Sequence, residues 1–182
     1  RLDTNRRVTV PYDLDKCEET GRIANFARAG GLEKGTFQGI PYNDSDVFKV
    51  IEGASYTLAT HPDPALAERI DVVIARIAAA QEDDGYLYTA RTLGATSPMT
   101  GPARWSNLAA SHELYNVGHL YEAAVAHFDA TGKRALLDVA LKNADLLCTT
   151  FGPGMLERAP GHQEVEIGLL PLFRATGERK YL

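Results

Sequence analysis

The segment from His112 to His119 carries the strongest chemical pattern in the chain. Its first residues, His-Glu-Leu-Tyr-Asn, come close to the H-E-x-x-H pattern of zinc proteases, but Asn116 occupies the second ligand position. His119 does not replace that ligand, because seven helical residues rise by about 10.5 Å, whereas two imidazoles on one zinc must each lie about 2.1 Å from it. The pattern therefore excludes a zinc-protease site. It leaves His112, Tyr115 and His119 as a polar stripe on an apolar helix, which either is satisfied inside a core or contacts a polar ligand such as a sugar.

A second group of polar residues begins another predicted helix. Pro160-Gly161-His162-Gln163-Glu164 places a histidine and several acceptors there, after a glycine-rich turn. Such residues are also good helix caps, since carboxylates are favoured at the N-terminal end of the helix dipole. Glu164 and Glu166 are two residues apart and point to different faces, so they are not a hydrolytic carboxylate pair. Capping is the favoured interpretation, and ligand binding stays open.

Two pairs of aspartates have structural interpretations of the same kind. Asp44 and Asp46 flank Ser45 at a helix start, where capping is favoured over catalysis. The pair Asp83-Asp84 precedes Gly85 and is typical of a turn.

Aromatic residues gather in and beside the segment that follows this turn. Tyr86, Tyr88 and Trp105 suit the apolar C–H face of a sugar, and they equally suit the cover of a helical core. The only cysteines, Cys17 and Cys148, lie in predicted helices, so we expect inert buried thiols.

The elements that must position these residues are helices. Apolar residues at helical spacing predict helices over residues 47–59, 65–81, 107–130, 133–149 and 162–175. A further helix is predicted from Pro11 to about residue 29, although Gly21 within it weakens that prediction. The irregular segment 86–102 is predicted to be a loop, and no strand is predicted. We expect His127 to lie on the outer surface of its helix.

A repeat indicates how these helices are arranged. Ala130-Thr131-Gly132 recurs 45 residues later as Ala175-Thr176-Gly177, each time between an apolar helix and a new one. The unit is a helical hairpin with glycine at the turn. Stacked hairpins of this period predict an all-α fold, either an open solenoid or a closed α/α toroid.

Composition excludes several classes of protein. With 182 residues, 45% hydrophobic and 24% charged, the chain is long and apolar enough for one ordinary folded domain. A net charge of −5 with scattered basic residues argues against a nucleic-acid partner. No apolar run is long enough to span a membrane.

Five motifs in register resemble glycoside hydrolase family 127, the beta-L-arabinofuranosidases, from about Arg22 to the last residue. Each motif alone is weak, but their shared order and spacing are specific. They are NDSDVFK at 43–49, DGYL at 84–87, SHELY with GHL within 111–120, EAAVA at 122–126 and PGHQE at 160–164.

The resemblance implies an (alpha/alpha)6 barrel followed by beta-sandwich domains. Residues 1–182 would be the N-terminal portion of that barrel, with the remainder beyond this chain. It also implies removal of terminal L-arabinofuranose, or a related pentose, by a retaining mechanism with a zinc-bound cysteine nucleophile and a glutamate acid/base. Those catalytic residues and the zinc ligands would lie beyond Leu182, so the resemblance places no metal ligand in this chain and we expect the chain alone to be inactive.

Carried over residue by residue, the resemblance makes two histidines sugar-hydroxyl ligands. His112 stands in its S-H-E-x-Y motif and His162 in its G-H-x-E-I-E motif. A neutral imidazole can both donate to and accept from a hydroxyl. The sequence departs from the family at Asn116, where cysteine is common. To the two histidines we add four residues of the candidate pocket: Tyr115, Asp46, Gln163 and Trp105.

Alternatives of other kinds remain at this point. One is another α/α-toroid enzyme, either an unsaturated uronyl hydrolase or a sugar epimerase, and another is a non-catalytic helical scaffold. The expected partners are a small carbohydrate, the remainder of the same chain and a second copy in a homodimer. We expect a cytoplasmic protein, with periplasmic or secreted location left open because the chain starts at Arg1 without a methionine.

Overall fold

The computed structural model describes residues 2–182, and within this range it is helical throughout, apart from turns and loops. One isolated β-bridge, between Phe151 and Leu156, is the sole strand-like pairing among these residues. The prediction of an all-α chain is thus confirmed. The elements are α1 (Leu2–Thr4), the π-helical turn η1 (Asn5–Thr9), α2 (Val10–Glu19), α3 (Arg22–Ala29), α4 (Asp44–Thr60), α5 (Pro64–Ala80), α6 (Thr89–Thr92), the 3-10 turn η2 (Pro98–Thr100), α7 (Leu108–Ser111), α8 (Glu113–Thr131), α9 (Ala135–Thr150), α10 (Glu164–Thr176) and the 3-10 turn η3 (Arg179–Tyr181).

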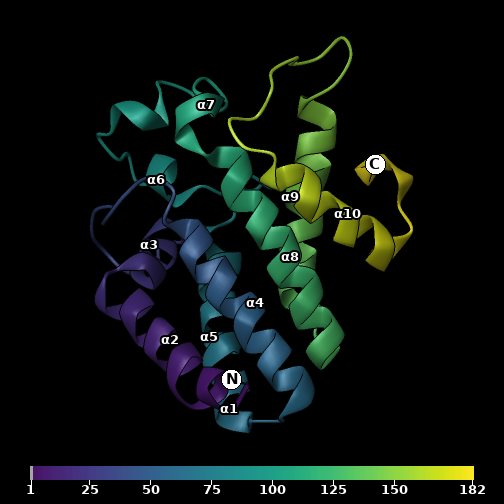
Figure 1. Cartoon of the computed structure of the whole chain (residues 1–182). Helices are drawn as coiled ribbons and strands as arrows, with labels where there is room; N and C mark the ends of the chain where they lie inside the picture. The colour runs from purple at the N-terminus through teal and green to yellow at the C-terminus, as the bar shows by residue number, and fades with distance from the viewer. Residues whose placement is uncertain (1) are drawn as a thin grey trace.

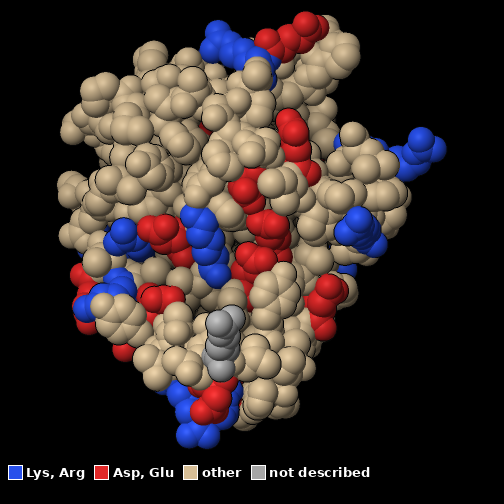
Figure 2. Space-filling model, viewed as in Figure 1, with Lys and Arg blue, Asp and Glu red and all other residues tan. Residues whose placement is uncertain are grey.

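Two helical hairpins form the centre of the molecule. Helices α4 and α8 pack along one another in the same direction, and each is followed by a helix that returns behind it, α5 after α4 and α9 after α8 (Figure 1). Helix α10 crosses α8 on its other side (Figure 1). On the face shown in Figure 2, acidic side chains gather over α8 and its seam with α4.

The hairpin turns follow the expected chemistry. Asp63 caps α5 by accepting hydrogen bonds from the backbone N–H groups of Ala65 and Leu66, and Pro64 occupies its first turn. Gly132 and Gly177 end α8 and α10 in the left-handed conformation, with φ of 71° and 74°. The repeated Ala-Thr-Gly motif therefore does mark the ends of equivalent helices.

Helices α8 and α10 approach closely at two glycines. A Cβ atom on Gly118 would lie 2.5 Å from the backbone of Glu164, and one on Gly168 would lie 2.3 Å from the carbonyl oxygen of Gly118. No larger side chain fits between two backbones at this separation. The crossing places the start of α10, with His162 just before it, against α8.

Three details differ from the sequence-based predictions. The predicted helix over 107–130 is two helices, α7 and α8, separated at His112. The N-terminal helix is divided at Gly21, whose φ is 76°. The loop over 86–102 contains the short elements α6 and η2.

The prediction for His127 is wrong. Its side chain lies in the core, with 1% of the residue exposed, and its Nε2 atom is 4.0 Å from Asp71 Oδ1. Helix α8 packs against α4, α9 and α10, so few of its positions face solvent. Among the described helices, none is both long enough and apolar enough to cross a bilayer.

Candidate functional site

His112 lies at the break between α7 and α8 in a conformation that side chains rarely adopt. Its φ and ψ are 57° and 27°, in the left-handed region. Such a conformation in a residue other than glycine costs about 1 to 3 kcal/mol and persists only where surrounding contacts impose it. The structure therefore contains specific contacts that hold this turn.

Glu113 supplies the first of those contacts. Only 1% of this residue is exposed, and its carboxylate accepts hydrogen bonds from Tyr86 Oη at 2.6 Å, Ser111 Oγ at 2.8 Å and the Trp105 backbone N–H at 3.2 Å. Tyr88 Oη donates to the Ser111 carbonyl at 2.8 Å. The residues on both sides of His112 are thus fixed by tyrosines from a distant turn.

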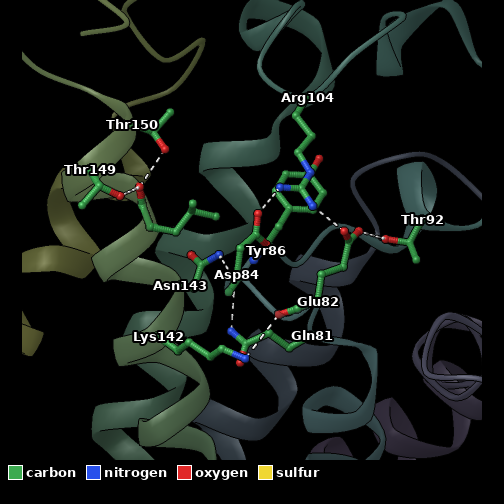
Figure 3. Close-up of polar contacts among 12 residues, drawn as sticks. Gln81, Glu82, Asp84, Tyr86, Thr92, Arg104, Lys142, Asn143, Thr149 and Thr150 are labelled. Atoms are coloured by element: carbon green, nitrogen blue, oxygen red, sulfur yellow. Dashed lines mark hydrogen bonds and ion pairs between the residues drawn. The ribbon is translucent and has the colours of Figure 1, made fainter.

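The turn that carries these tyrosines is fixed by polar side chains (Figure 3). The Arg104 guanidinium lies over the Tyr86 ring, pairs with Glu82 and bonds Asp84 at 2.5 Å. Asp84 also accepts from the Tyr86 backbone N–H at 3.1 Å, which confirms the turn interpretation of this aspartate. Tyr86 and Tyr88 are fully buried, so they cover the core and hold the His112 turn.

The contacts of the His112 ring determine which of its nitrogens is free. Nδ1 lies 2.9 Å from the Ala110 carbonyl oxygen. A carbonyl only accepts, so Nδ1 carries the hydrogen, and in the neutral ring Nε2 is left as an acceptor. The ring packs against Tyr42, with 4.6 Å between the ring centroids.

His162 has the opposite arrangement. Its Nδ1 accepts a hydrogen bond from the Glu164 backbone N–H at 3.1 Å, at the first residue of α10. Nδ1 is therefore unprotonated, and in the neutral ring Nε2–H is a donor. The capping interpretation holds for His162 alone, because Gln163 makes no side-chain cap, and it leaves one nitrogen of the His162 ring for another partner.

Tyr115 brings the two histidines to one place. The His112 and His162 rings meet the Tyr115 ring edge to face, with centroid distances of 5.6 and 4.8 Å. The His119 ring meets it at 4.7 Å. The Tyr115 hydroxyl lies 2.6 Å from Lys49 Nζ, from α4. These residues, His112, Tyr115, His119 and His162, are called the Tyr115 cluster below.

The other candidate residues have different surroundings. Asp46 accepts from Arg22 Nε at 2.7 Å and lines a groove with Lys49 and Cys17. Gln163 is exposed immediately before α10. Trp105 is buried, and its ring packs edge-on against Tyr86 and Phe151 at 5.1 and 5.4 Å, which favours a core role. Whether these three contact a ligand stays a prediction.

The capping interpretation of Asp44 and Asp46 is wrong. The residue before α4 makes no side-chain cap. Asp44 instead accepts hydrogen bonds from Thr89, at 2.8 Å from the backbone N–H and 2.5 Å from Oγ1, while Asp46 pairs with Arg22. Asp44 is 1% exposed, and burial raises its pKa to about 6 against the opposing effect of the Thr89 hydrogen bonds.

His119 of the Tyr115 cluster also belongs to a group that the sequence analysis did not identify. His119 Nδ1 is 3.4 Å from a carboxylate oxygen of Glu122 and 3.3 Å from one of Glu164. Burial lowers the pKa of His119 and raises the pKa of Glu122, to which the neighbouring Glu164 also contributes. We call these three residues the His119 triad. The spacing of His119 and Glu122 on one helix could have indicated this pair, but not the addition of Glu164 from α10.

Comparison with known proteins identifies the family. The model of the beta-L-arabinofuranosidase, GH127 catalytic domain matches residues 1–182. The chain belongs to glycoside hydrolase family 127. A non-reducing end beta-L-arabinofuranosidase from Bifidobacterium longum subsp. longum is 43% identical over 162 residues, which are 88% of this chain and 24% of that protein.

Solved structures of the family share the fold. The GH127 beta-arabinofuranosidase BT3674 superposes with a TM-score of 0.93 and 48% identity over 100% of this chain and 30% of that one. Ara127N, a GH127 beta-L-arabinofuranosidase from Geobacillus stearothermophilus T6, superposes with a TM-score of 0.93 and is 41% identical. The match covers 99% of this chain and 29% of that one. The expected α/α-barrel fold is confirmed, and the chain spans a quarter to a third of these relatives. The uronyl hydrolase, epimerase and scaffold alternatives gain no support from these matches.

Proposed function

We propose that this chain forms the N-terminal portion of the catalytic barrel of a beta-L-arabinofuranosidase that removes a terminal L-arabinofuranose, or a related pentose, by a retaining mechanism. The observation that carries the proposal is the pairing of His112 and His162 around Tyr115, with complementary hydrogen-bonding atoms. The identity of the sugar is inferred from the names of the related enzymes.

The two histidines suit a sugar because each hydroxyl group both donates and accepts. Nε2 of His112 accepts a hydroxyl hydrogen, and Nε2–H of His162 donates to a hydroxyl oxygen. Each ring is held by a backbone partner, so little side-chain freedom is lost on binding. Tyr115, fixed by Lys49, keeps the two rings apart at a set spacing. We add Asp46, Gln163 and Trp105 as further residues of the pocket.

The described residues of this chain do not fit the thiolate zinc site that the family resemblance implies. Cys17 lies in α2 and Cys148 in α9, and both are unpaired. Neither cysteine lies in a group of three potential metal-ligating side chains among the described residues. The proposal therefore places the zinc, its ligands, the nucleophile and the acid/base beyond Leu182.

The proposal also covers the partners of the protein and its location in the cell. Its partners are a small carbohydrate and the remainder of its own chain, and we also propose a homodimer. Two unpaired cysteines suit the reducing cytoplasm, which is the location we propose.

The test is substrate selectivity of the full-length protein. We expect release of 4-nitrophenol from the β-L-arabinofuranoside, with retention of the anomeric configuration in early time points followed by NMR. The α-L-arabinofuranoside and the β-D-galactopyranoside are the controls and should not be hydrolysed. Activity on either control alone would overturn the proposed substrate, and an inverted first product would overturn the mechanism.

A further inference from the structure

We propose that the His119 triad, His119, Glu122 and Glu164, binds one divalent cation. The site lies where α8 meets the first residue of α10, and it shares His119 with the Tyr115 cluster. It goes beyond the proposed glycosidase, because it requires neither the sugar nor the thiolate zinc, and it adds a metal site to a chain in which the sequence analysis expected none.

The geometry suits one metal ion. Each of the three residues offers one ligand atom, and these atoms lie within 4.8 Å of one another. The imidazole nitrogen is 3.3 and 3.4 Å from the two carboxylates. Bonds of about 2.1 Å to a common ion would separate adjacent ligand atoms by about 3.0 to 3.4 Å, so His119 Nδ1 needs almost no movement.

One ligand atom of the triad has no hydrogen-bond partner among the described residues. His119 Nδ1 is buried and makes no hydrogen bond within the described part of the chain. The Glu164 side chain is nine-tenths buried, and its carboxylate faces both the His119 ring and the carboxylate of Glu122. A buried ring nitrogen without a hydrogen bond is unfavourable, and a cation between it and the two carboxylates removes that cost.

The nearby cation is committed elsewhere. Lys49 faces this region from α4, but its ammonium donates to Tyr115 Oη at 2.6 Å and to Ser45 Oγ at 3.3 Å. It therefore does not neutralise the two carboxylates directly. Among the described residues, the two carboxylates form ion-pair contacts only with His119.

An acidic groove leads to the triad from solvent. Glu122 also lines a depression between α4, α8 and α10, together with Glu52, Tyr56 and Asp129. The acidic side chains gathered on this face are visible in Figure 2. A groove lined by one sign of charge raises the local concentration of counter-ions and attracts a cation to the site.

The ligand set indicates the class of cation. One imidazole with two carboxylates suits Mn²⁺ or Zn²⁺, while a set without thiolate disfavours Cu(I). Both ions are therefore suitable probes. Mn²⁺ has the advantage that its free form gives an electron paramagnetic resonance signal that is lost on binding.

The experiment measures Mn²⁺ binding to the full-length protein after chelation and removal of metal, with Zn²⁺ as competitor. We expect one Mn²⁺ per chain that Zn²⁺ displaces and that is additional to any metal at the thiolate site. Glu164→Gln and His119→Ala should weaken the binding of this ion at least tenfold. Glu166→Gln is the matched control, because Glu166 lies on the same helix and is exposed. It should bind Mn²⁺ as the unmodified protein does.

Thermal unfolding provides a second readout that separates lost binding from lost folding. In the presence of EDTA, Glu164→Gln should melt at or above the temperature of the unmodified protein, since it removes a buried charge. Mn²⁺ should raise the melting temperature of the unmodified protein and the Glu166→Gln protein only. If the unmodified protein binds no more Mn²⁺ than Glu164→Gln does, the proposal is overturned and the triad is a cluster that shares a proton.

Discussion

Single residues of this chain determine how its stability depends on pH, and Asp44 is the clearest case. Burial raises its pKa from 3.8 to about 6. The folded state therefore binds a proton that the unfolded state releases between these values, and stability falls as pH rises through that interval. Above about pH 6 the loss is complete and stays constant. The Thr89 hydrogen bonds oppose this effect without cancelling it.

We predict that Asp44→Asn removes this dependence, because an amide has no charge to bury. Between pH 4 and pH 7 the stability of the unmodified protein should fall by about 2 to 3 kcal/mol relative to the variant, at about 1.4 kcal/mol per pKa unit. Chemical unfolding at several pH values measures the difference. A constant difference, or a gain by the unmodified protein on raising the pH, would contradict the assignment.

His112 provides a second test at this scale, since its backbone conformation favours glycine. Both His112→Gly and His112→Ala lose the imidazole, so comparing them isolates the backbone. With φ at 57°, we predict that the glycine variant is more stable than the alanine variant by about 1 to 2 kcal/mol. Equal stability in thermal unfolding would mean that the turn between α7 and α8 is not held in the left-handed conformation.

At the scale of elements, the packing of α10 on α8 controls where His162 lies. We predict that Gly168→Ala destabilises the protein by about 1 to 3 kcal/mol, because its Cβ would meet a backbone carbonyl. The same change at Gly53, in open space within α4, should instead stabilise by about 0.5 to 1 kcal/mol. Chemical unfolding curves of the Gly168→Ala, Gly53→Ala and unmodified proteins measure these differences in stability. Stabilisation by Gly168→Ala would show that the two helices do not approach so closely.

Local sequence patterns predicted most helices, since apolar spacing, Pro64 and the glycines at 132 and 177 act within a few residues. The break at His112 was not predicted, because the tyrosines that hold it come from a turn more than twenty residues earlier. The same reason explains Asp44, whose partner Thr89 is 45 residues away. The two histidines proposed as sugar ligands could be named from the motifs, but which of their ring nitrogens is free depends on backbone partners that only the folded chain defines.

At the scale of the whole molecule, the chain presents one side of an α/α barrel. The hairpins α4–α5 and α8–α9 repeat in parallel, and α10 adds the next helix beside α8 (Figure 1). The Tyr115 cluster forms where α4, α8 and the start of α10 meet. The two proposed sugar ligands therefore come from different elements: His112 directly precedes α8, and His162 lies before α10. The α8–α9 hairpin alone would not supply both.

The central claim is that His112 and His162 bind the terminal sugar, and its most direct test is kcat/KM of the full-length enzyme on an aryl β-L-arabinofuranoside. Removal of either imidazole leaves a hydroxyl without its partner, at a cost of about 1 to 3 kcal/mol. We predict that His112→Ala and His162→Ala each lower kcat/KM by roughly 5- to 150-fold. His61→Ala, at an exposed position between α4 and α5, should leave it unchanged. Folded His112→Ala and His162→Ala variants with the kcat/KM of the His61→Ala control would contradict the assignment.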